Sequence, residues 1–171
     1  MTASAPRLST YLRTRHGEFV DIFSPEAHGE GRAYPEGAIE LVLSGKAVLT
    51  TDLWDDIEFL WWYLVDMVAQ FFAHGSGRMD FPDQPLTATL TRRRGDWLLF
   101  EVTAWRGREV ITSSSVREKE LVGLLATEGA KTLRRLTELN PANTVNNERA
   151  LARLFALAGA LAQQEQSAGG P

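Results

Sequence analysis

The chain has 171 residues, an apolar content of 44%, a charged content of 23% and a formal net charge of −4. These values are typical of one globular domain with a full hydrophobic core. The negative charge argues against nucleic acid as the main partner, because phosphate binding needs a concentrated basic surface. The absence of cysteine excludes disulfides, thiol nucleophiles and zinc sites with cysteine ligands.

Composition along the chain predicts a single domain over residues 11–165. Residues 1–10 and 166–171 are small and polar, which is typical of flexible tails. Between them we find no linker, no repeat and no low-complexity segment. The N-terminal sequence lacks the apolar core of a secretion signal, so we expect a cytoplasmic protein.

Alternating apolar residues predict strands in the first half of the chain. Phe19–Phe23 alternates and is short, whereas residues 24–37 are dense in Gly, Pro and Glu and predict a loop. In the run from Ile39 to Thr50, apolar and polar side chains alternate, and Ser44-Gly45-Lys46 interrupts the pattern. This run predicts strand structure with a turn or a bulge at the interruption.

The stretch DLWDDIEFLWWYLVDMVAQFF, residues 52–72, is the most unusual part of the sequence. Fifteen of its twenty-one residues are apolar, five are acidic and none is basic. Its apolar residues recur at three- and four-residue steps, which predicts an amphipathic helix. Thr51 or Asp52 can cap the start of this helix. His74-Gly75 ends it, because Gly adopts the left-handed cap conformation at low cost.

Strand signals return after this helix. Residues 86–91 alternate apolar side chains with threonine, and Trp97–Trp105 is rich in residues that favour strands. Arg94-Gly95-Asp96 separates the two as a hairpin turn, and residues 109–112 return as a further strand. The second half of the chain therefore begins with a predicted three-stranded meander.

Two helices are predicted at the C-terminal end. Ser115-Val-Arg-Glu118 has the pattern of a capping box, so we expect a helix from Val116 to Leu139. Asn140-Pro141 stops this helix. A last amphipathic helix carries Leu151, Leu154, Phe155, Ala158 and Leu161 on one side. Blocks of strands and helices without strict alternation predict the α+β class with a mostly antiparallel sheet.

Residues 52–72 are not expected to cross a membrane. Asp55, Asp56, Glu58 and Asp66 lie inside the segment, and each would cost at least about 2.5–3.5 kcal/mol at the centre of a bilayer. No basic flank sets an orientation. On a helical wheel, nearly half of the circumference is apolar, and we expect that half to pack on the sheet.

The other side of this helix combines acids with aromatic rings and is the candidate partner-binding site. The residues predicted to bind a partner are Asp52, Asp55, Asp56, Phe59, Trp62, Tyr63 and Asp66. The carboxylates would attract a basic partner, and the rings would supply buried contact area. The alternative is that the C-terminal helices bury the three rings in a second layer. The solvent exposure of Trp62 and Tyr63 distinguishes the two interpretations.

Metal and catalytic signals are weak. Glu26, His28 and Glu30 are residue types that bind metals, but no second cluster lies near them, and solvated side chains are the better interpretation. The chain's histidines lie in no zinc-binding or nucleophile motif, and its carboxylates show no acid–base pairing. The sequence predicts no catalytic residue, no metal and no cofactor, and an enzyme is disfavoured rather than excluded.

A basic cluster surrounds the predicted hairpin turns. Arg92-Arg93-Arg94 lies at one turn, Arg106 and Arg108 lie at the next, and tryptophans are close by in sequence. Arginine with aromatic rings on a sheet can bind single-stranded nucleic acid. Glutamates share the same strands, however, and charges at turns are usually only solvated.

Two segments carry a family resemblance. Asp-Leu-Trp-Asp-Asp-Ile-Glu-Phe-Leu-Trp (52–61), together with Phe81-Pro-Asp-Gln-Pro85 and the Leu-Thr-Ala-Thr-Leu that follows it, is similar to small uncharacterised actinobacterial proteins. The acidic α+β layout over residues 50–140 resembles immunity proteins of polymorphic toxin systems. These proteins share no universal motif, so the resemblance assigns no residue a role. It implies an inhibitor that masks a basic toxin surface.

The sequence therefore favours a non-enzymatic, cytoplasmic, immunity-like protein-binding domain. Its partner would be another protein, such as a basic toxin domain, or a second copy of the chain. The alternative is a small-molecule-binding or biosynthetic enzyme domain with a pocket between helices and sheet, lined by Trp61, Trp97 and Trp105. A nucleic-acid module that uses the arginine hairpins is the third hypothesis.

Overall fold

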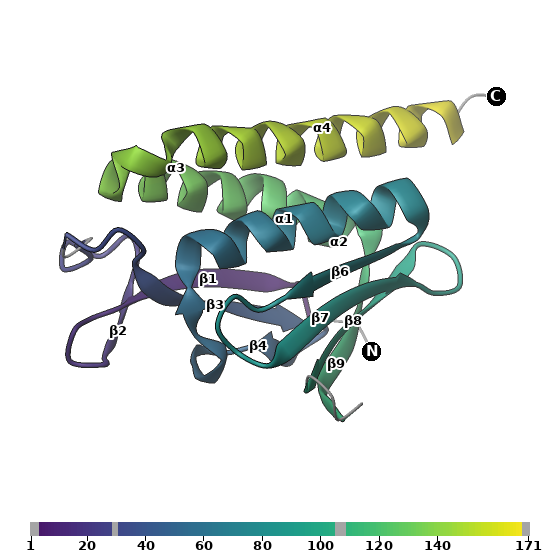
Figure 1. The fold of residues 1–171 in the computed structure, drawn as a ribbon. Helices are drawn as coiled ribbons and strands as arrows, with labels where there is room; N and C mark the ends of the chain where they lie inside the picture. Colours follow the sequence, from purple (N-terminus) through teal and green to yellow (C-terminus); the bar gives the residue numbers. More distant parts are fainter. Residues whose placement is uncertain (1–3, 29–30, 105–108, 169–171) are drawn as a thin grey trace.

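The computed structural model describes residues 4–28, 31–104 and 109–168. The chain forms a single α+β domain, with two antiparallel sheets on one side and helices stacked over them (Figure 1). The predicted fold class is confirmed, including the mostly antiparallel pairing and the helices at the C-terminal end.

The first sheet contains five strands of the described residues. They are β1 (Arg7–Arg13), β2 (Phe19–Asp21), β3 (Glu36–Leu43), β4 (Lys46–Leu49) and β5 (Asp55–Asp56). The order is β2-β1-β3-β4, and β5 also pairs with β3. The turn predicted at Ser44-Gly45 joins β3 to β4, and both residues have positive φ. Residues 7–10, which the sequence assigned to a tail, instead begin β1 and pair with β3.

The second sheet contains four strands of the described chain, in sequence order. They are β6 (Ser76–Asp80), β7 (Leu86–Arg92), β8 (Trp97–Ala104) and β9 (Val110–Arg117). The predicted three-stranded meander thus lacked β6, whose sequence has no strand pattern. Gly77 allows β6 to run directly beneath the central helix, because a Cβ there would overlap the carbonyl oxygen of Met67. The backbone N–H of Arg78 also donates to the Gln70 side chain of that helix at 3.3 Å.

The helix α1 (Ile57–His74) lies between the sheets and the C-terminal helices (Figure 1). Its predicted apolar side is buried: Ile57, Leu60, Trp61, Leu64, Val68 and Phe71. Gly75 ends the helix with a φ of 80°, and its N–H donates to Phe71 at 2.7 Å. In the described residues, α1 and every other helix lack the combination of length and apolar character that crossing a membrane needs.

The start of α1 differs from the sequence prediction. The helix begins at Ile57 rather than near Asp52, because Asp55 and Asp56 pair with β3 as a short strand. The backbone N–H of Ile57 donates to the Pro35 carbonyl at 3.0 Å. Tertiary pairing therefore removes the first acids from the helix and places them in an extended segment beside β3.

Three further helices follow the second sheet within the described residues: α2 (Glu118–Leu124), α3 (Ala130–Leu139) and α4 (Thr144–Ala168). The predicted capping box is wrong, because β9 continues to Arg117 and α2 begins without a side-chain cap. A π-helical turn, Leu125–Gly129, joins α2 to α3, and Asn140 ends α3 as predicted. On α4, Leu154 is buried, whereas Phe155 is exposed.

Candidate functional site

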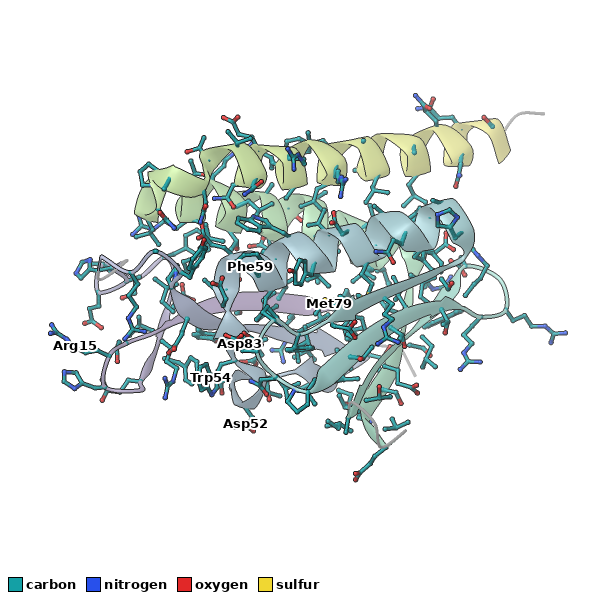
Figure 2. The ribbon with its side chains drawn as sticks, viewed as in Figure 1. Arg15, Asp52, Trp54, Phe59, Met79 and Asp83 are labelled. Carbon is teal, nitrogen blue, oxygen red and sulfur yellow. The ribbon has the colours of Figure 1, made fainter. Side chains whose placement is uncertain are left out.

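A pocket of about 440 Å³ opens at the N-terminal end of α1. Three segments line it. Tyr34 and Glu36 come from the start of β3, Asp52 and Trp54–Asp56 from the chain before α1, and Asp83 and Gln84 from the β6–β7 loop. Figure 2 shows Asp52, Trp54 and Asp83 grouped beneath the start of α1. We call this site the acidic pocket, since five of its eight lining residues are Asp or Glu.

Asp55 holds the walls of the acidic pocket together. This residue is buried, and one carboxylate oxygen accepts the N–H groups of Asp83 and Gln84 at 2.9 and 3.2 Å. The other oxygen accepts the N–H of Asp56 at 2.8 Å. The side chain of Gln84 donates back to the Trp54 carbonyl. Burial raises the pKa of Asp55, and these backbone N–H groups oppose the rise. The loop is thus fixed to the segment before α1 by hydrogen bonds.

Asp56 caps the N-terminus of α1 and also lines the acidic pocket. Its carboxylate accepts the N–H groups of Glu58 and Phe59, both at 3.1 Å, which stabilises the first turn of the helix. Its pKa is raised to about 6, chiefly by burial and in smaller part by the neighbouring carboxylates of Glu58 and Asp55, while the two backbone N–H groups oppose the rise. A positive charge placed beside this carboxylate would oppose that rise.

One wall of the acidic pocket already holds a guanidinium group. The Arg13 side chain lies over the Trp54 ring at 4.1 Å and donates to Glu36 at 2.9 Å. Arg32 also pairs with Glu36, at 3.4 Å. Among the described residues, no ion pair involves Asp52, Asp56 or Asp83. The pocket therefore keeps an excess of negative charge after its internal cations are counted.

Glu58 lies on the other side of the same helix end and has a different environment. It is fully buried, and its carboxylate accepts the side-chain amides of Asn140 and Asn143 at 2.8 and 2.5 Å and that of Asn147 at 3.5 Å. Burial raises its pKa, and the three amides oppose the rise. Glu58 thus binds the α3–α4 connection to the start of α1 and offers nothing to solvent.

Aromatic rings lead away from the acidic pocket along α1. Tyr34, which lines the pocket, lies 5.6 Å from Phe59, and Phe59 lies 4.9 Å from Trp62 and 5.7 Å from Tyr63 between ring centroids. Tyr34 is 56% exposed and Tyr63 36% exposed, while Phe59 and Trp62 are half-buried. We call these four residues the aromatic ridge. Its outer rings are open to solvent, and its inner rings are fixed by packing.

The ridge ends at a smaller hollow between α1 and α4. This hollow, of about 170 Å³, is lined by three residues of α1 (Trp62, Tyr63 and Asp66) and four of α4 (Asn146, Arg149, Ala150 and Arg153). Asp66 pairs with Arg153, and the indole N–H of Trp62 donates to Asn147 at 2.8 Å. Arg149 is exposed and forms no ion pair with any described residue. We call this hollow the basic notch.

The predicted partner-binding residues are brought together in two groups rather than on one continuous surface. Asp52, Asp55 and Asp56 line the acidic pocket, whereas Trp62, Tyr63 and Asp66 line the basic notch. Phe59 contacts rings of both groups. The cover predicted by the alternative interpretation is partial, because α4 packs on α1 and half-buries Trp62 but leaves Tyr63 exposed.

Sequence reasoning missed several residues of this region: Tyr34, Glu36, Trp54, Asp83 and Gln84 of the acidic pocket, Arg149 and Arg153 of the basic notch, and the buried Glu58. Tyr34 and Asp83 lie in loops far from α1 in sequence, and only the pairing of β5 with β3 and the Asp55 hydrogen bonds bring them to it. Trp54 lies in the segment that the sequence assigned to the amphipathic helix. Its signal was the pair of acids that follows it, which favours a capping position over a helix interior.

The other candidate sites have a weaker structural basis. The described residues contain no cluster of three His, Asp or Glu side chains arranged to bind a metal, and Glu30 lies outside the described residues. Trp61 is fully buried and donates to Thr10 at 3.3 Å, Arg117 covers Trp97, and Trp105 is not described. In the arginine cluster, Arg92 pairs with Glu118, while Arg106 and Arg108 lie outside the described residues.

Comparison of the chain with protein-family models, with curated proteins and with solved structures found no match in any of the three. The resemblance to immunity proteins therefore stays an expectation of the sequence.

Proposed function

We propose that this protein is a non-enzymatic binding protein that holds a positively charged side chain of a protein partner in the acidic pocket. The observation that carries the proposal is a preformed pocket in which Asp52, Asp56 and Asp83 form no ion pair with a described residue. An arginine or lysine side chain of the partner would supply the missing charge, and the desolvated wall would strengthen the attraction.

The walls of the pocket suit a flat cation. Trp54 and Glu36 already bind the guanidinium of Arg13 by ring stacking and a hydrogen bond. Tyr34 offers a second ring in the same pocket. Arginine binds aromatic faces and carboxylates together because its guanidinium is planar and weakly hydrated. We therefore expect an arginine of the partner to bind more tightly than a lysine.

Protein binding is favoured over small-molecule binding by the surface beside the pocket. The aromatic ridge extends contact area beyond the pocket, and aromatic residues are frequent anchors of protein interfaces. An inhibitor of the immunity type is one form of such a binder. A small organic amine is the second candidate, because a volume of about 440 Å³ is within the usual range for ligand sites.

The direct test is a titration with N-acetyl-arginine methylamide, followed by NMR of the backbone amides and of the Trp54 indole. We expect millimolar binding that shifts residues of the acidic pocket and weakens as salt is added. The citrulline analogue, which has nearly the same shape without charge, serves as the control ligand. Equal binding of the two compounds, or shifts confined to another surface, would contradict the proposal.

A matched pair of variants identifies the carboxylates involved. The double variant Asp52→Asn/Asp83→Asn removes two charges from the pocket, and we expect it to lose binding. Glu109→Gln/Glu120→Gln changes the net charge equally at exposed positions outside the pocket and should retain it. Both carboxylates of the first pair are exposed, so the variant should fold normally.

A further inference from the structure

The two hollows at the ends of the aromatic ridge have opposite electrostatic character. Five carboxylates line the acidic pocket, and among the described residues Arg13 and Arg32 are the cations that form ion pairs with them. The basic notch contains Arg149 and Arg153 against Asp66 alone. After the Asp66–Arg153 pair is formed, Arg149 is the charge that the notch leaves for a ligand.

Contacts between the four rings of the aromatic ridge connect the two hollows. Tyr34 belongs to the acidic pocket, Trp62 and Tyr63 belong to the basic notch, and Phe59 contacts all three rings. Asp56 and Asp66 mark the two ends on α1, and ten residues of helix separate them by about 15 Å. One short peptide segment could therefore reach both hollows and lie across the ridge.

We propose that the partner presents a segment with a basic side chain for the acidic pocket, an acidic side chain for Arg149 in the basic notch, and an apolar residue between them on the ridge. The inference rests on the proposed function and adds the second charge and the direction of the segment. In an extended chain, the two charged residues would be about four to six positions apart, since each residue spans about 3.3 Å.

Charge complementarity is the argument for this occupant. A uniformly basic partner would satisfy the acidic pocket but would meet repulsion from Arg149 at the other end of the ridge. A uniformly acidic partner would be attracted by Arg149 but repelled by the acidic pocket. A segment with both signs in one order fits both hollows, and the order sets the direction in which it binds.

Selection from a random dodecapeptide library against the full chain tests the inference. We expect the enriched peptides to share an arginine or lysine and an aspartate or glutamate at a fixed separation, with an aromatic or aliphatic residue between them. Binding of one enriched peptide to Arg149→Glu should fall about fivefold to tenfold, because attraction at the notch becomes repulsion. The same peptide with its acidic residue changed to lysine should bind Arg149→Glu better than wild type.

Arg94→Glu is the control variant, since it makes the same change in net charge on the exposed β7–β8 hairpin. It should change the affinity less than twofold. Arg149 is exposed and forms no ion pair with a described residue, so its replacement should leave the fold intact, and a circular dichroism melt checks this.

The outcomes separate the two proposals. Peptides that share a basic residue but no acidic one, together with unchanged binding to Arg149→Glu, would overturn this inference and leave the proposed function standing. Enriched peptides without a basic residue, or no enrichment at all, would count against the proposed function and against this inference with it.

Discussion

Two acid-rich regions lie within a few residues of each other at the start of α1, and their carboxylates have opposite roles. Glu58 is fully buried and satisfied by three asparagine amides, whereas Asp52 and Asp83 are exposed in the acidic pocket and form no ion pair with a described residue. The first region stabilises the packing of α4 on α1. The second leaves its charges exposed to solvent. Acidic residues that look equivalent in the sequence thus differ in solvent exposure, because the C-terminal helices cover one side of this region and leave the other side open.

Loss of the buried carboxylate should have the largest effect. Glu58→Ala leaves the amides of Asn140, Asn143 and Asn147 without their acceptor, and we expect a loss of about 3 kcal/mol in the free energy of unfolding. Urea denaturation measures it. Asp52→Ala, on the exposed side, should change stability by less than about 0.5 kcal/mol. Similar losses for the two variants would show that the two regions do not differ as described.

The next largest effect should be the pH dependence of ligand affinity at the acidic pocket. Because burial raises the pKa of Asp56 to about 6, Asp56 becomes protonated as the pH falls through that value. Affinity for N-acetyl-arginine methylamide should then fall about tenfold between pH 7 and pH 5, as the ionised fraction falls. The Asp56 carboxyl carbon, followed by NMR, reports the titration itself. Asp56→Asn should bind weakly at both pH values. An unchanged pH profile in this variant would show that Asp56 is not the group whose titration controls the affinity.

The same pKa fixes the sign of a stability effect. The folded-state pKa of Asp56 is above its ordinary value of 3.8, so the folded state holds the proton more tightly than the unfolded state. The contribution of Asp56 to stability is therefore fully present below about pH 4 and is lost as the pH rises to about 6. Asp56→Asn should flatten the stability profile in this window, as urea unfolding between pH 4 and pH 7 would show. An unaltered profile would contradict the assigned pKa.

Removal of an exposed ring from the ridge should have a smaller effect, on binding alone. Tyr63 is at the solvent-exposed end of the ridge, so Tyr63→Ala should weaken binding of an enriched peptide by about 1 kcal/mol. Its thermal stability should change little.

Trp62→Phe is the contrasting variant: it keeps a ring but removes the hydrogen bond to Asn147, so it should lower stability by about 1 kcal/mol. A loss of stability in Tyr63→Ala, with Trp62→Phe unaffected in stability, would place Tyr63 in the core.

The ion pair between Asp66 and Arg153 should have the smallest effect. Both side chains are nearly half exposed, and solvent screens such pairs. A double-mutant cycle with Asp66→Asn and Arg153→Gln should give a coupling energy below about 0.5 kcal/mol in urea unfolding. A coupling of several kcal/mol would mean that α4 is held on α1 by charge rather than by apolar packing.

The sequence predicted the elements that have strong local signals. The three- and four-residue spacing in residues 57–71 fixed which side of α1 is buried, and Gly75 fixed where it ends, because both properties depend on side-chain spacing and backbone freedom within the segment. Residues 86–91 and 97–104 likewise form strands as expected. Where the local pattern was weak, as in β6, the strand was missed, since only contact with α1 and β7 holds it.

The candidate site was only partly visible for the same reason. The sequence alone shows the aromatic and acidic character of residues 52–66, and the expectation of binding rather than catalysis was based on it. The division of these residues between an open pocket and a notch shared with α4 was decided by tertiary structure. The pairing of Asp55 and Asp56 with β3, the docking of the Asp83 loop, and the cover of α4 over Glu58 are contacts between segments distant in sequence. No local spacing encodes such contacts, and they determine which carboxylates stay available to a partner.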